Sequence, residues 1–239
     1  MAFAREIQVS LLPDSLPEVE GWDIVAGNIP SRGVSGDFFK VELRHDESEV
    51  VLMLSDVSGK GIGASLLTAS LEALSAGPIH DGVPVEVIFR SVSHLLFDRT
   101  PPEKYATSFL ASVEPNTGFL RYCNAGHNPG LLLRADGSTE WLESTGMPLG
   151  ILPEGVFTAD EKTLEVGDTL ILYTDGITEP EDPDEEEYGQ DRLEAVCVKN
   201  REEPIAEIMA AIEKDLYGFV RGVPFLDDRT LVLIRRIES

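Results

Sequence analysis

The chain has 239 residues and a formal net charge of −24 at pH 7, with 43 acidic and 19 basic side chains. A field of that sign repels nucleic acid and anionic membranes, and no cluster of Lys or Arg offsets it locally, so we expect neither as a partner. The composition is otherwise that of a globular protein with a sizeable core. Two isolated cysteines, Cys123 and Cys197, predict buried thiols in a reducing compartment. With no signal-peptide pattern and no stretch approaching the length of a membrane span, we expect a soluble, cytoplasmic protein.

The N-terminal residues 1–12 have apolar side chains at helical spacing, and Pro13 ends the pattern. Two interpretations are about equally favoured: a helix that docks on this domain, or the end of a longer helix from an upstream sensor domain. Beyond it no linker or internal repeat divides the chain. We therefore predict an N-terminal linker or regulatory helix at residues 1–15 and one domain at residues 16–239.

Three strands are predicted next, at residues 22–28, 38–43 and 50–55. Asp37 directly precedes the second strand and Asp56 directly follows the third. Because a short polar hairpin joins these strands, the two acids can face each other across one sheet edge.

A glycine-rich turn after Asp56, Val57-Ser58-Gly59-Lys60-Gly61, leads straight into a predicted helix at residues 62–76 that Gly77-Pro78 ends. A second helix, residues 84–97, opens at Pro84. We expect His94 at the edge of the core rather than as a ligand.

The second half of the chain alternates short strands with well-marked turns. Strands are predicted at residues 106–113, 118–124, 130–134, 169–173 and 230–237. The loop before residue 130 carries His127, for which a turn-stabilising role is favoured over a proton donor. A clear amphipathic helix is predicted at residues 204–219.

Two more acids occupy strand ends: Asp175 follows the apolar run 170–173, and Asp227 precedes the last strand with Asp228 beside it. The acidic segment 179–187 is predicted to be a mobile surface loop, and its place next to Asp175 makes it a candidate flap. Four strand-edge acids without a Cys or His cluster favour hard divalent cations, Mn²⁺ or Mg²⁺.

Six motifs now stand in order along the chain. They are Ile7-Gln8 with Leu11-Leu12-Pro13, Ser35-Gly36-Asp37-Phe38, Asp56-Val57-Ser58-Gly59-Lys60-Gly61, Asn124-Ala125-Gly126-His127, Thr174-Asp175-Gly176 and Asp227-Asp228-Arg229-Thr230. Together they resemble the SpoIIE/RsbU-type branch of the metal-dependent 2C-class (PPM) serine/threonine protein phosphatases. The resemblance implies an α+β fold, an α-β-β-α sandwich of two antiparallel sheets flanked by helices.

The resemblance also implies a centre of two Mn²⁺ or Mg²⁺ ions that activate a water molecule for hydrolysis of phosphoserine or phosphothreonine. Asp56 would bridge both ions and the Val57 carbonyl would help to hold the second. Asp175 and Asp227 would bind the first ion, and Asp37 would act at the second, directly or through water. Asp228 ranks below Asp227, because related phosphatases often carry asparagine there.

Phosphate binding is less well determined by these motifs. Arg32 is a candidate for the arginine that broader 2C-type phosphatases use to hold phosphate, although a surface ion pair explains it equally well. Lys60 could also reach an anion, but a place at the helix start is its plainer role.

The implied substrate is a small phosphorylated anti-sigma-factor antagonist of STAS type, with an upstream sensor domain or activator acting through the helices at residues 62–76 and 84–97. A homodimer through the N-terminal helix is a further expectation. Two alternatives stay open: a catalytically silent phosphatase-like module that regulates a sigma-factor partner switch, and a metal hydrolase of small phosphate esters.

Overall fold

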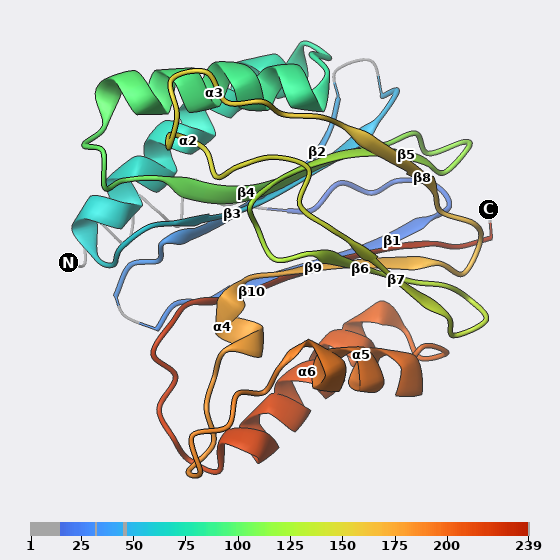
Figure 1. Ribbon diagram of the computed structural model, residues 1–239. Helices are drawn as coiled ribbons and strands as arrows, with labels where there is room; N and C mark the ends of the chain where they lie inside the picture. The colour runs from blue at the N-terminus through green and yellow to red at the C-terminus, as the bar shows by residue number, and fades with distance from the viewer. Residues whose placement is uncertain (1–14, 32, 45–46, 239) are drawn as a thin grey trace.

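The structure, a computed structural model, describes residues 15–31, 33–44 and 47–238. Within these ranges two five-stranded antiparallel sheets lie face to face, and helices cover both outer sides (Figure 1). The predicted α-β-β-α sandwich is therefore confirmed. The predicted helix at residues 1–12 and the candidate Arg32 lie outside the described residues.

Sheet A has the strand order β1-β10-β9-β6-β7, so two of its three interior strands, β9 and β10, come from the last third of the chain. Its strands are β1 (Trp22–Ile29), β6 (Gly130–Leu133), β7 (Thr139–Leu142), β9 (Thr169–Tyr173) and β10 (Arg229–Arg236). Sheet B has the order β2-β3-β4-β5-β8. Its strands are β2 (Asp37–Leu43), β3 (Val50–Val57), β4 (Ala106–Val113), β5 (Phe119–Ala125) and β8 (Asp160–Thr163).

The helices form the two outer layers. Helices α2 (Ile62–His80) and α3 (Val85–Arg99) cover sheet B, whereas α4 (Asp175–Thr178), α5 (Gln190–Lys199) and α6 (Ile205–Val220) lie on the side of sheet A (Figure 1). Three apolar clusters fill the spaces between these four layers. On β4, Leu110 packs toward α2 and α3 while its neighbours Phe109 and Ala111 pack between the sheets. Both faces of the strand are buried, which is why its sequence is almost continuously apolar.

Helix α2 does not end at Gly77-Pro78 as predicted but continues to His80, with Pro78 inside it. Proline removes one backbone hydrogen bond, but Ile79 is completely buried in the cluster beneath α2 and α3. Burial of that side chain outweighs the local preference of Pro78 for ending the helix.

Helix α2 is also, contrary to the expectation from sequence, long and apolar enough to cross a membrane by length and composition alone. It carries seven buried residues, among them Ala64, Leu67 and Leu71, and these pack against the core beside sheet B. A core helix of a globular domain passes the same test, so α2 serves as a layer of the sandwich.

The acidic segment 179–187 lies at the surface, as predicted, and forms a hairpin, while its predicted mobility stays a prediction. Glu181 and Glu187 make an isolated antiparallel bridge, and Arg221 donates to both Asp182 (2.6 Å) and Asp184 (2.7 Å) across the turn. The arginine compensates part of the like-charge repulsion within the segment.

His94 differs from its prediction as well. Its side chain is 58% exposed, with Nδ1 3.1 Å from the Pro153 carbonyl oxygen and Nε2 near Asp98, so it lies on the surface and not at the core edge. Both cysteines are buried as predicted.

Candidate metal centre

The first pair of acids faces across the β2–β3 hairpin as the sequence predicts. Asp37 is the first residue of β2, and the antiparallel register places it directly opposite Asp56, the second-last residue of β3. Side chains opposite each other in an antiparallel pair have Cβ atoms about 5 Å apart. Two carboxylates at that spacing repel one another, so the hairpin gathers negative charge at this edge of sheet B.

Asp37 connects sheet B to sheet A. Its carboxylate is only 3% exposed, and Oδ2 accepts hydrogen bonds from the hydroxyls of Thr174 (2.7 Å) and Thr230 (2.6 Å). Burial and the neighbouring Asp56 raise the pKa of Asp37 well above its usual value, and the two threonine hydroxyls oppose that rise. The side chain is therefore held in one orientation by both sheets.

Asp56 lies close to the acids of the sheet A side. Burial first, and then the charges of Asp175, Asp227 and Asp228, raise its pKa to about 7. Three carboxylates from the sheet A side thus lie close enough to act on an acid of sheet B. Such a group is costly to ionise in the folded chain unless a cation compensates it.

Asp175 occupies the first turn of the short helix α4, which the sequence analysis missed. Burial, Glu179 and Asp227 raise the pKa of Asp175 to about 6. The glycine after it allows the close packing of α4 on the segment before β10, because a Cβ atom at Gly176 would lie 1.8 Å from the Asp228 carbonyl oxygen. The Asp-Gly pair thus brings the carboxylate of Asp175 toward Asp227.

The two consecutive acids before β10 point in different directions. Asp227 accepts a hydrogen bond from Lys60 Nζ at 2.7 Å. Asp228, only 6% exposed, accepts from the backbone N–H groups of Ser31 (2.6 Å) and Gly36 (2.7 Å). Both Asp228 oxygens therefore stabilise the loop that leads into Asp37, and its role as a metal ligand stays a prediction.

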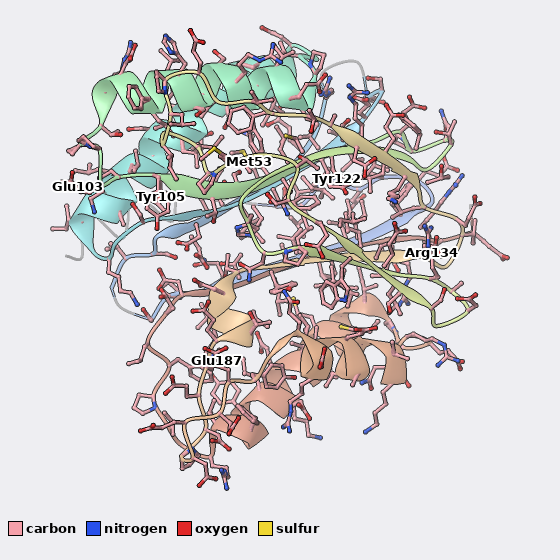
Figure 2. The ribbon with its side chains drawn as sticks, in the orientation of Figure 1. Met53, Glu103, Tyr105, Tyr122, Arg134 and Glu187 are labelled. Carbon is pink, nitrogen blue, oxygen red and sulfur yellow. The ribbon has the colours of Figure 1, made fainter. Side chains whose placement is uncertain are left out.

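A cavity of about 380 Å³ opens beside these acids. Its lining includes the acids Asp56, Asp175 and Glu179, and Ser58, Tyr105 and Asn128 are among the other lining residues. Figure 2 labels Tyr105 next to the start of β4 and Glu187 in the segment after α4, both toward the same end of the sandwich. The opening is thus formed by segments of both sheets.

His127 lines the same cavity but is held as a structural residue would be. Its backbone N–H donates to Asn124 Oδ1 (2.8 Å), and its Nδ1 lies 3.0 Å from the Thr107 hydroxyl. Burial lowers its pKa to about 4, an effect that the backbone of Tyr173 partly offsets, so the imidazole is neutral at pH 7. The predicted turn-stabilising role of His127 stays a prediction.

The donor set fits a hard divalent cation, because it consists of carboxylate and carbonyl oxygens. A Cβ atom at Gly36 would lie 3.2 Å from the Val57 carbonyl oxygen and 3.5 Å from Asp56 Oδ1, so the glycine leaves space open between these two predicted ligands. Across the described ranges, no three His, Cys, Asp or Glu side chains already form a set that could hold an ion. Carbonyl and water oxygens would complete the coordination of a cation held by these carboxylates, because Mg²⁺ usually keeps several waters.

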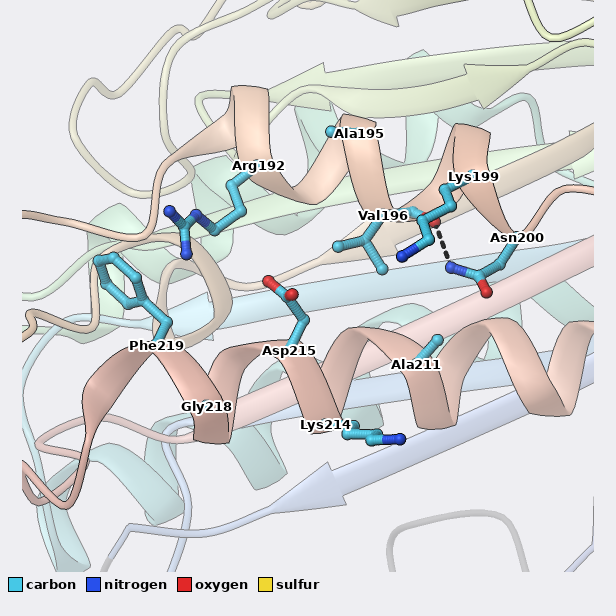
Figure 3. A pocket seen from close by; sticks show the side chains of 10 residues that line it. All are labelled: Arg192, Ala195, Val196, Lys199, Asn200, Ala211, Lys214, Asp215, Gly218 and Phe219. Atoms are coloured by element: carbon cyan, nitrogen blue, oxygen red, sulfur yellow. Dashed lines mark hydrogen bonds between the residues drawn. The ribbon is translucent and has the colours of Figure 1, made fainter.

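A larger hollow of about 580 Å³ lies between α5 and α6 and contains none of these acids. Figure 3 shows its lining, with Asp215 and Phe219 projecting from α6 and Arg192 and Lys199 from α5. No oxygen-rich group of the kind described above converges on it, so the edge of the two sheets is the better candidate site.

Comparison with known proteins agrees with this assignment. The family model of stage II sporulation protein E (SpoIIE) matches residues 46–237. Protein IcfG of Synechocystis is 30% identical over 97% of this chain, and the phosphoserine phosphatase RsbU of Bacillus subtilis is 25% identical over 98%. The chain spans 40% of the length of IcfG and 69% of that of RsbU.

A solved structure extends the similarity to the fold. The structure of the RsbU and RsbW domains of Rv1364c from Mycobacterium tuberculosis superposes with a TM-score of 0.82 at 27% identity, covering 95% of this chain and 63% of that one. The family model covers most of the sandwich and includes three of the four clustered acids, Asp56, Asp175 and Asp227. The chain is thus a member of the SpoIIE family.

Proposed function

We propose that this chain is a metal-dependent protein serine/threonine phosphatase. The observation that carries the proposal is the convergence of acids from both sheets on one cavity, with the pKa of Asp56 raised to about 7. Concentrating carboxylates in this way costs folding free energy, which a bound cation would recover. The name of the relative RsbU, a phosphoserine phosphatase, supports the same activity.

In this proposal the acids divide between two cations. Asp56 would help to hold both, Asp175 and Asp227 would hold the first, and Asp37 would act at the second together with the Val57 carbonyl oxygen. The Asp37 carboxylate is already oriented by the threonine hydroxyls that hold its Oδ2. Asp228 keeps the Asp37 loop in place through its two backbone hydrogen bonds.

Bound divalent cations would supply positive charge for the phosphoryl group and would make a water molecule more acidic. The carboxylates of the chain would hold the cations. Ser58, Tyr105 and Asn128, which line the cavity, would limit the directions from which the phosphate ester can approach. Phosphate contacts from Arg32 and Lys60 stay predictions. His127, neutral at pH 7, keeps the loop beside Thr107 in register rather than delivering a proton.

Thiol chemistry is not available to the two cysteines. Cys123 and Cys197 are buried, and burial raises their pKa values to about 11 and about 12. A phosphatase nucleophile of the cysteine type must be ionised near neutral pH and reachable by substrate. Neither cysteine meets these conditions, so we assign hydrolysis to the acids at the edge of the two sheets and not to a cysteine nucleophile.

The activity is tested by hydrolysis of para-nitrophenyl phosphate and of a phosphoserine protein while Mn²⁺ or Mg²⁺ is titrated against EDTA. We expect turnover that requires the metal and that Asp56→Asn abolishes. Asp191→Asn, which removes an equal charge from the exposed start of α5, is the matched control and should keep full activity. Turnover in EDTA, or full activity of Asp56→Asn, would contradict the metal-centre assignment.

The proposed substrate is a phosphorylated anti-sigma-factor antagonist of STAS type in a cytoplasmic partner switch, with an upstream sensor or activator. The family membership and the name of RsbU support this context. A comparison of phosphorylated STAS-type protein, unrelated phosphopeptides and nucleotides tests it: preference for the folded protein is expected, and preference for nucleotides would favour a hydrolase of small phosphate esters. Tight Mn²⁺ binding and partner capture without turnover, even with the activator present, would favour the silent binding module.

A further inference from the structure

Lys60 places a positive charge inside the acidic edge. Its Nζ donates to Asp227 Oδ2 at 2.7 Å and to the Leu226 carbonyl oxygen at 2.8 Å. It reaches them from the turn between β3 and α2, where Gly59 and Gly61 on either side adopt positive φ angles of 96° and 76°. These backbone angles favour glycine, and they direct the lysine side chain across the opening toward the segment before β10.

The ammonium also acts on acids to which it is not hydrogen-bonded. Its charge opposes the upward pKa shifts of Asp56, Asp175 and Glu179. Together with Asp227, these include all three carboxylates assigned above to the first cation. Lys60 therefore compensates, in the metal-free chain, the same charges that the first cation would compensate.

The ion pair between Lys60 and Asp227 is exposed enough for another cation to replace the ammonium group. The Lys60 and Asp227 side chains are 43% and 42% exposed, so water can replace either partner during separation. An ion pair at such exposure contributes little to stability. A divalent cation, with twice the charge and direct coordination to oxygen, is a stronger partner for the carboxylate than an ammonium group.

We propose that Lys60 is the internal counter-cation of the metal-free site, and that the first metal ion displaces it from Asp227. The inference rests on the proposed metal centre. It assigns Lys60 a role in setting metal affinity. In the metal-free protein the ammonium group reduces the repulsion among the carboxylates. A metal ion must then displace this ammonium group from Asp227 in order to bind.

Displacement is measured by amine-selective labelling and mass spectrometry, without metal and with saturating Mn²⁺. Lys60 should become labelled about threefold faster or more once Mn²⁺ takes its carboxylate partner. Lys104 is the internal control, because its Nζ donates to the Ser58 carbonyl oxygen (3.3 Å) in the same turn and forms no ion pair with any carboxylate among the described residues. Its labelling rate should stay the same.

Metal affinity is measured by isothermal titration with Mn²⁺ in the wild type, Lys60→Met and Lys104→Met. Removing the competing ammonium should tighten the first dissociation constant about two- to fivefold. Lys104→Met also removes one positive charge near the site, and it should change the first dissociation constant for Mn²⁺ less than Lys60→Met does.

If Lys60→Met binds Mn²⁺ with the same affinity as the wild type, or more weakly, the proposed displacement of Lys60 by the metal ion is wrong. Labelling of Lys60 that ignores Mn²⁺ in a protein that binds the ion would overturn it as well. A wild type that binds no Mn²⁺ at all would overturn the metal centre itself, and with it the displacement.

Discussion

Asp56→Asn should stabilise the metal-free protein at alkaline pH while it removes activity. The pKa of Asp56 rises from 3.8 to about 7 on folding, so the folded state binds more protons than the unfolded state between these values. The stability that this provides is present below the unfolded pKa and is lost as pH rises through the folded pKa. At about 1.4 kcal/mol per pKa unit, the shift destabilises the folded state by about 1.5 kcal/mol at pH 5, where Asp56 stays protonated, and by about 4 kcal/mol at pH 8, where Asp56 is ionised.

Urea unfolding in EDTA at pH 5 and pH 8 measures this difference. Relative to wild type, Asp56→Asn should gain about 2.5 kcal/mol more at pH 8 than at pH 5. Asp191→Asn controls for the loss of one negative charge from a strongly acidic chain. The reasoning is refuted if Asp56→Asn changes the free energy of unfolding by the same amount at both pH values, because burial and the neighbouring carboxylates would then not raise the pKa of Asp56 in the folded chain.

Two further perturbations test the supports of the site. Asp228→Ala should lower the free energy of unfolding in EDTA by about 3 kcal/mol, because it leaves two backbone N–H groups without their charged acceptor. A loss below about 1 kcal/mol in urea unfolding would show that water replaces the carboxylate. Arg221→Ala removes the contacts to Asp182 and Asp184. Hydrogen exchange of the hairpin amides should therefore become about threefold faster or more, while the free energy of global unfolding hardly changes. Unchanged exchange would mean that the hairpin is ordered without the arginine.

Strands with strong apolar patterns could be predicted from sequence nearly to the residue. The predicted strands at 106–113 and 169–173 coincide with β4 and β9. Each is buried on both faces, so side-chain composition alone identifies it. The β7 and β8 strands were missed: β8, Asp160–Thr163, is a charged edge strand that pairs with β5 through its backbone, and its side chains carry no such signal.

The acids of the site could be named from sequence, but their different roles could not. Asp227 and Asp228 are neighbours with identical side chains, yet one meets Lys60 and the other meets Ser31 and Gly36. Contacts between residues almost 200 positions apart depend on how the two sheets are stacked. The same applies to Asp37, whose threonine partners come from the opposite sheet.

The division of the acids between two sheets has a consequence for control. Asp37 and Asp56 belong to sheet B, while Asp175 follows β9 and Asp227 precedes β10 of sheet A. Sliding one sheet over the other would change the distance from Asp56 to Asp175 while leaving every hydrogen bond within each sheet intact. The spacing of the four carboxylates therefore depends on how the two halves of the sandwich are aligned, and the hydrogen bonds from Thr174 and Thr230 to Asp37 help to fix that alignment.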